Sequence, residues 1–159
     1  MINLDRLLRT IEAKYGSLDK PRFDFVETTL RKDPYALLRE KISRAAEVED
    51  LTDSNDDVCF SYRIRSTDGG LLLRVSMVGP YFVLTRPFSW GAHGRFVEPG
   101  EPREGLERQI TEMCLQEGLI QIDRKTCEHP IEMPMFKTEP ERVRIFNAIF
   151  TDTDLLPWE

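Results

Sequence analysis

The amino-acid sequence predicts an α+β domain in which an antiparallel three- to four-stranded meander sheet packs against about four helices. Three observations lead to this fold class. A length of 159 residues, 40% of them hydrophobic and 31% charged, is typical of one compact domain with an ordinary core. Residues 58–86 alternate apolar and polar side chains between turn signals, as strands do. The segments on both sides repeat apolar residues at helical spacing.

We expect a single domain over residues 1–159. Its parts are a helical portion at 1–50, the sheet at 57–86, a long loop at 87–103 and a helix–strand–helix portion at 104–159. The chain has no long apolar window, and its start lacks the basic-then-apolar order of a signal peptide. Three widely spaced cysteines fit a reducing compartment. These features predict a cytoplasmic protein without membrane contact.

The N-terminal part predicts two helices and one extended segment. Apolar residues within 2–15 recur at helical spacing, and a glycine follows as a stop signal. The segment 21–27 alternates charged and apolar residues, which predicts a short edge strand or an extended arm. Asp33 followed by proline predicts the start of a second helix, ending near Glu47. Residues 47–57 hold six acidic residues and no basic one, so we expect a solvated linker there.

Three strands, at 58–67, 71–78 and 81–86, form the centre of the prediction. Asp-Gly-Gly separates the first two strands and Gly-Pro the next two, and both are signals for tight turns. The first strand divides its side chains between two faces, with Val58, Phe60, Tyr62 and Ile64 on one and Cys59, Ser61, Arg63 and Arg65 on the other. An antiparallel sheet of this kind leaves one face open unless another segment covers it.

The C-terminal part predicts a helix at 103–117 and a short fourth strand at 119–122. The pattern Thr-x-x-Glu at 138–141 is a capping box, which predicts a helix that continues to Phe150. We expect Trp158 to dock on the body of the domain because leaving a large aromatic ring in water forfeits the free energy of burial.

The charge of the chain is acidic and unevenly distributed. The net charge is −6, and the last 59 residues carry seven basic and thirteen acidic residues. A protein that binds phosphate backbones usually shows the opposite sign in a cluster, so the sequence disfavours nucleic acid as a partner. An acidic surface can steer a basic protein partner, or it can simply keep the protein in solution.

Motifs for metal binding and catalysis are missing. Cys127 and His129 make one close pair, whereas a structural zinc site needs four ligands, so we expect no metal. The chain has two histidines and none of the serine-elbow, P-loop or dinucleotide-binding patterns. The sequence therefore predicts a protein that is not an enzyme and needs no cofactor.

The most unusual segment is the loop at 87–103, which is long for a connection inside a compact domain. It contains Trp90, His93 and Arg95 among several prolines and further aromatic residues. Aromatic residues and arginine are enriched where protein interfaces are tightest. The loop either binds a partner or folds over the open face of the sheet, and the sequence leaves both possibilities open.

The end of the chain carries a resemblance. Residues 143–152 (VRIFNAIFTD), followed by 155–158 (LLPW), resemble the closing segment of small bacterial immunity proteins, which are encoded beside polymorphic toxins. The resemblance implies an acidic, cytoplasmic α+β domain that binds a toxin domain tightly and blocks its active site or the entry of its substrate. It carries over no catalytic residue.

We therefore hypothesise a non-enzymatic protein-binding domain, an immunity protein that neutralises a cognate toxin of basic surface. The expected contact residues are the loop anchors Trp90, His93 and Arg95 and the charge partners Glu101, Glu104, Asp152 and Asp154. An alternative is a small-molecule-binding domain or an enzyme with a pocket under the 87–103 loop, in which His93 is the acid or base. A third is an accessory protein that acts by self-association. The oligomeric state stays open.

Overall fold

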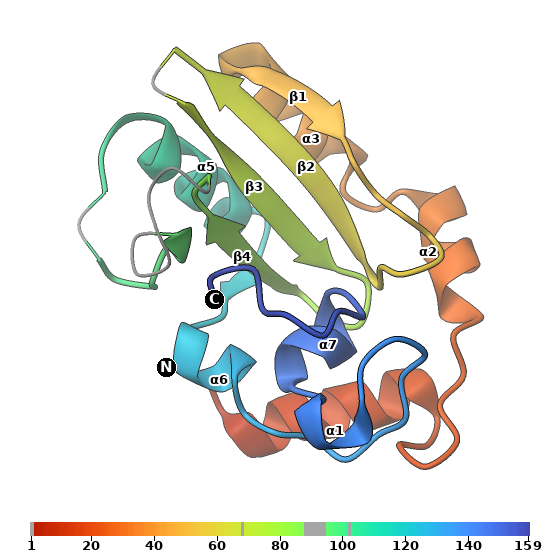
Figure 1. Ribbon diagram of the computed structural model, residues 1–159. Helices are drawn as coiled ribbons and strands as arrows, with labels where there is room; N and C mark the ends of the chain where they lie inside the picture. The colour runs from red at the N-terminus through yellow and green to blue at the C-terminus, as the bar shows by residue number, and fades with distance from the viewer. Residues whose placement is uncertain (1, 68, 88–94, 102) are drawn as a thin grey trace.

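The computed structural model describes residues 2–67, 69–87, 95–101 and 103–159 (Figure 1). The described strands are β1 (Glu47–Asp50), β2 (Cys59–Ser66), β3 (Gly69–Ser76), β4 (Tyr81–Thr85) and β5 (Ile120–Gln121). The described helices are α1 (Leu4–Tyr15), α2 (Phe25–Lys32), α3 (Ala36–Ala45), α5 (Gly105–Gln116), α6 (Arg124–Cys127) and α7 (Ile145–Ile149), with a 3-10 turn at Pro140–Arg142. The predicted α+β class is confirmed.

The strands form one sheet in the order β1-β2-β3-β4-β5. The predicted antiparallel meander of β2, β3 and β4 is confirmed, and β1 extends it as a further antiparallel strand. The predicted fourth strand is present as β5, but it pairs with β4 in the parallel direction. The reason is that α5 lies between β4 and β5 in the chain, and a helical crossover brings the next strand back in the same direction.

One face of the sheet packs on helices. Tyr35, at the start of α3, meets the ring of Phe60 edge-on at 6.0 Å between centroids. Arg39 of α3 donates a hydrogen bond of 3.3 Å to the hydroxyl of Tyr62. Figure 1 shows α3 and α5 behind the sheet. The apolar side chains of β2 that share this face, Phe60, Tyr62 and Ile64, are buried, as their alternation predicts.

The described residues cover the opposite face at one end only. The amide of Val58 donates to the carbonyl of Phe150 at 2.8 Å, which ties α7 to the start of β2. The C-terminal segment crosses the sheet near β4 (Figure 1). At the far end of β2 the side chains of Arg63 and Arg65 remain about half exposed. The open face that the sequence anticipates is therefore the arginine-bearing half of this side.

The extended segment predicted at 21–27 is wrong, because the chain enters helix α2 at Phe25. The rings of Phe23 and Phe25 both pack edge-on against Tyr15 of α1, at 5.2 and 5.3 Å between centroids. The alternating apolar residues, which are partly buried, thus pack against a helix instead of a sheet. Alternation over a few residues does not identify what the apolar side chains pack against.

The linker predicted at 47–57 is also partly wrong, because its first four residues form the edge strand β1. Glu49 pairs in register with Arg63, and its carboxylate contacts the guanidinium groups of Arg63 and Arg65 at 3.4 and 3.0 Å. Val48 packs against the core. The segment 47–57 contains no basic residue of its own, and the arginines of the neighbouring strand supply the positive charge that its first part contacts.

The capping box predicted at 138–141 is wrong as well. The hydroxyl of Thr138 donates to the carboxylate of Asp152 at 2.6 Å instead of capping a helix. Only the 3-10 turn follows, and α7 begins at Ile145. A carboxylate distant in sequence therefore competes successfully for the local capping group.

The docking predicted for Trp158 is confirmed, since its side chain is fully buried. Its indole ring meets Phe96 at 4.9 Å and Phe146 at 5.2 Å, both edge-on, and its Nε1 donates to Glu128 at 2.8 Å. These contacts fasten the end of the chain to α6, to α7 and to the strand edge at Phe96. No helix in the described ranges is both long and apolar enough to cross a membrane.

Replacing Trp158 by alanine removes this anchor and opens a cavity. We expect the free energy of unfolding, measured by urea denaturation, to fall by about 3–5 kcal/mol. Leu155→Ala is the control, because its side chain is 67% exposed, and the same measurement should change by less than about 0.5 kcal/mol. Equal effects of the two substitutions would contradict the anchoring role.

The three cysteines, Cys59, Cys114 and Cys127, are buried free thiols. Burial raises the pKa of Cys59 and of Cys114 to about 12, and burial also raises the pKa of Cys127 well above its ordinary value. Because the thiolate is the reactive form, we expect none of the three to react with a disulfide reagent in the native protein at about pH 8. All should react once denaturant unfolds the chain. A thiol that titrates rapidly under native conditions would show that its site opens.

Candidate functional site

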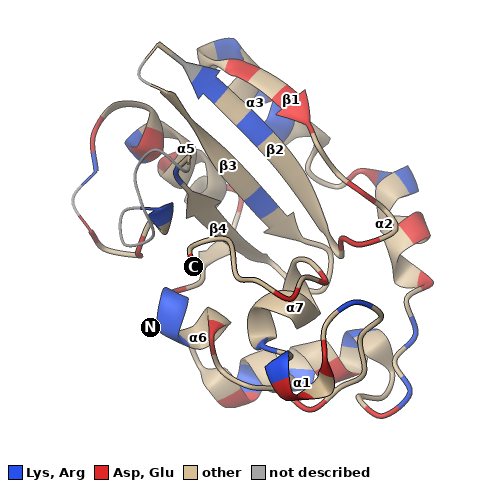
Figure 2. Cartoon of the chain, in the orientation of Figure 1, with Lys and Arg blue, Asp and Glu red and all other residues tan. Residues whose placement is uncertain are grey.

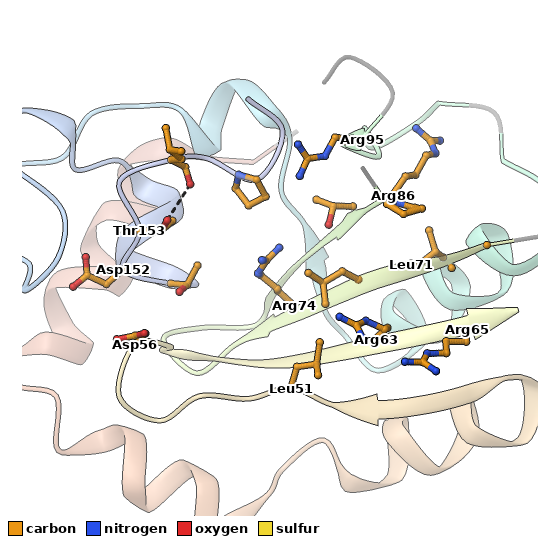
Figure 3. A pocket seen from close by; sticks show the side chains of 18 of the residues that line it. Leu51, Asp56, Arg63, Arg65, Leu71, Arg74, Arg86, Arg95, Asp152 and Thr153 are labelled. Atoms are coloured by element: carbon orange, nitrogen blue, oxygen red, sulfur yellow. Dashed lines mark hydrogen bonds between the residues drawn. The ribbon is translucent and has the colours of Figure 1, made fainter. Parts of the chain in front are cut away.

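A groove of about 1170 Å³ lies over the uncovered part of the sheet. Side chains of β2 and β3 form its floor, and residues 151–155 and 157 form one wall. Thr85–Pro87 and Arg95 line it from the β4 side. The charged residues that line it are the basic Arg63, Arg65, Arg74, Arg86, Arg95 and Lys137 and the acidic Asp56, Asp152 and Asp154. We call it the arginine groove (Figure 3).

The pairing of β2 with β3 places the arginines of the floor on one face. Ser61 lies opposite Arg74, and Arg63 lies opposite Leu72. Because side chains alternate along each strand, Arg63, Arg65 and Arg74 all point away from the helices α3 and α5. Figure 2 shows basic residues along β2 and β3 and acidic residues on β1. An acidic protein thus presents a local excess of positive charge.

Arg74 occupies the centre of the arginine groove (Figure 3). Its guanidinium lies over the ring of Phe146 in α7, 5.5 Å from the centroid. Its Nη1 is buried and has no hydrogen-bond partner among the described residues. Burial lowers the pKa of Arg74, while the nearby Cys59 and Asp57 act in the opposite direction. Arginine stays charged in proteins, so this is a positive charge held with incomplete solvation.

Four other basic side chains among the described residues of the groove have acidic partners, and two of them, Arg63 and Arg65, share Glu49. Lys137 contacts Asp56 at 2.6 Å. Arg86 forms an ion pair with Glu107 at 2.7 Å and a second one with Glu101. These contacts raise the pKa of Arg86, the hydrogen bond to Glu107 contributing most. Among the ion pairs of the described residues, none involves Arg74.

The predicted loop anchors Trp90 and His93 lie outside the described residues. Arg95 is buried and lines the groove, and its Nη1 donates to the carbonyl of Glu159 at 3.4 Å. Glu101 contacts Arg86 and also accepts the amide of Glu98 at 2.9 Å. Burial raises the pKa of Glu101, but the hydrogen bonds from Arg86 and from the amide of Glu98, with the nearby arginine charges, together outweigh burial and lower the net pKa.

The other predicted charge partners differ in exposure. Glu104 is exposed at the start of α5 and forms no side-chain cap there. Asp154 is exposed and accepts the amide of Glu139 at 3.4 Å. Asp152 is buried, and its carboxylate accepts three backbone amides at 2.8–2.9 Å in addition to the hydroxyl of Thr138. Asp152 therefore holds the segment 136–138 against the C-terminal segment, and its carboxylate is occupied within the fold.

The structure brings Arg95, Asp152 and Asp154 together at the arginine groove, and Glu101 joins them through Arg86. Glu104 is not part of its lining. Sequence reasoning placed Arg63 and Arg65 on one face of their strand but did not select them as site residues, and it missed Arg74. The predicted hairpin could have revealed all three arginines, because its turn sets the register of β2 and β3, and this register places the arginines on one face.

No group of three or more histidine, cysteine, aspartate or glutamate side chains in the described ranges is arranged to hold a metal ion. Comparison of the whole chain with protein-family models, with curated proteins and with solved structures finds no match in any of the three. The chemistry of the arginine groove is therefore the basis on which a function can be assigned.

Proposed function

We propose that the protein is a non-enzymatic binding domain that holds an anionic ligand in the arginine groove. The buried Nη1 of Arg74, which has no hydrogen-bond partner among the described residues, carries this proposal. A poorly solvated charge without a bonded partner costs free energy in the ligand-free protein. An anion bonded to this guanidinium recovers that cost, and charge-assisted hydrogen bonds to arginine are among the strongest that proteins make.

The size and charge of the groove support this proposal. Its volume of about 1170 Å³ accommodates a small organic ligand, for which pockets of roughly 300–1,000 Å³ are usual. Among the described residues, six basic side chains line the groove against three acidic ones. Low-dielectric walls with an excess of one charge focus the field and raise the local concentration of ions of the opposite sign. The groove thus attracts anions although the chain as a whole has a net charge of −6.

The proposal develops the pocket alternative raised by the sequence. Thr85, Arg86, Pro87 and Arg95 line the groove and border the 88–94 segment in the chain. We propose binding without catalysis because two of the acidic side chains in the lining are already engaged. Asp152 accepts backbone amides, and Asp56 pairs with Lys137.

The substitution Arg74→Met tests this proposal, with inorganic phosphate as the probe in an NMR titration at constant ionic strength. We expect saturable shifts of groove resonances in the wild-type protein and none in Arg74→Met. The ligand-free variant should unfold at an equal or higher urea concentration, because an apolar side chain replaces a poorly solvated charge.

Arg44→Met is the matched control, since Arg44 is an exposed arginine of α3 that pairs with Glu40. It should bind phosphate as the wild-type protein does. Retained binding in Arg74→Met, or an equal loss in Arg44→Met, would refute a specific anion site.

The neutralisation of a basic toxin is a second candidate, and exposed apolar side chains in the acidic C-terminal part favour it. Phe136 is 83% exposed and Leu155 67% exposed, and each lies beside an acidic residue, Asp152 through a hydrogen bond and Asp154 in sequence. Apolar anchors surrounded by charge are the usual composition of a tight protein interface.

A tagged pull-down from source cells tests this second candidate. We expect one stoichiometric partner whose toxicity is relieved by co-expression. The double variant Glu104→Lys with Asp154→Lys should slow association at low salt, because both acids are exposed. Glu12→Lys with Glu27→Lys, two exposed residues of α1 and α2, controls for net charge. No enriched partner in expressing cells, or equal slowing by both double variants, would argue against it.

A further inference from the structure

We propose that the ligand of the arginine groove is a small compound with adjacent phosphate groups, one bound by Arg74 and the other by Arg63 and Arg65. Glu49 occupies the second position when no ligand is bound. This inference rests on the proposed anion-binding function and names the class of ligand and the residue that competes with it.

The spacing of the floor residues supports two anion positions. Arg74 lies opposite Ser61, and Arg63 is two residues further along β2 on the same face. Such diagonal neighbours lie roughly 7–8 Å apart between Cα atoms. Arg65 follows after about another 6.6 Å along the strand, given a rise of about 3.3 Å per residue. Side chains as long as arginine bridge these distances, so the three guanidinium groups, all of which line the groove, can contact neighbouring anionic groups in one ligand.

The two positions differ in what they contact without a ligand. The Nη1 of Arg74 is buried and has no hydrogen-bond partner among the described residues. Arg63 and Arg65 are about half exposed, and both contact the single carboxylate of Glu49 at 3.4 and 3.0 Å. Exposed ion pairs contribute little to stability, so an incoming anion can displace Glu49 at small cost.

The competition with Glu49 favours phosphate over carboxylate as the second group. An incoming carboxylate would replace one carboxylate by another, with the same charge and number of oxygens. A phosphate group carries a charge of about −1.5 to −2 near pH 7 and three strong acceptor oxygens. It can therefore serve two planar guanidinium forks at once, which the Glu49 carboxylate does only with one long contact of 3.4 Å.

Isothermal titration calorimetry at constant ionic strength tests the inference, with phosphate, pyrophosphate and tripolyphosphate as probes. We expect pyrophosphate or tripolyphosphate to bind the wild-type protein at least about tenfold more tightly than phosphate. The double variant Arg63→Gln with Arg65→Gln should lose this advantage and keep the affinity for phosphate. Glu49→Gln should bind pyrophosphate about three- to tenfold more tightly, because the competing charge is gone.

Glu40→Gln is the matched control for Glu49→Gln, since Glu40 is an exposed acid whose partner, Arg44, lies outside the groove. Urea denaturation of each variant verifies that it is folded. No advantage of the condensed phosphates, or an effect of Glu40→Gln equal to that of Glu49→Gln, would overturn the inference. If citrate binds as tightly as pyrophosphate, the ligand need not carry phosphate groups. If oligothymidylate binds more tightly than pyrophosphate, the proposal of a small ligand is wrong.

The failure of this inference and that of the proposed function are distinguishable. If phosphate binds through Arg74 and the condensed phosphates bind no more tightly, the proposed anion site is supported and the second phosphate position is refuted. If Arg74→Met leaves the binding of all three probes unchanged, both the anion site at Arg74 and the second phosphate position are refuted.

Discussion

The antiparallel pairing of β2 with β3 determines which side chains meet the helices and which meet the solvent. In this register Ser61 faces Arg74 and Tyr62 faces Leu73. Because side chains alternate along each strand, the same pairing creates an apolar face for α3 and a basic face on the other side. A shift of the register by one residue would exchange the two faces of the shifted strand and place arginine against α3. The core and the candidate site are therefore two results of one pairing.

The C-terminal segment decides how much of the basic face becomes a groove. Trp158 packs against Phe96 and Phe146, and Asp152 holds the amides of residues 136–138. These two anchors fix α7 and the segment after it over one half of the face. Phe146 thereby comes to lie against the guanidinium of Arg74. The contacts that fix the C-terminal segment therefore also leave Arg74 poorly solvated. Functional sites often keep a feature of this kind that lowers the stability of the protein.

The balance of charge along the chain does not predict the local sign of the groove. The sequence excess of acid lies in the last 59 residues, whereas three arginines of the groove floor come from β2 and β3. Their charges add because the sheet holds them on one face. Some acidic side chains are paired within the fold: Asp152 accepts a hydrogen bond from Thr138, and Glu101 forms an ion pair with Arg86. A net charge of −6 is therefore compatible with a site for anions.

Local patterns in the sequence determined the α+β class, the meander of β2 to β4 and the docking of Trp158. In each case the alternation of side chains, the turn residues or the apolar surface of one side chain determines the outcome without a specific partner elsewhere in the chain. The helix α2, the strand β1 and the role of Thr138 were decided by partners distant in the chain: Tyr15 for Phe25, Arg63 for Glu49 and Asp152 for Thr138. The arginine groove belongs to the second group, because its charge and its burial exist only after β2, β3 and α7 have come together.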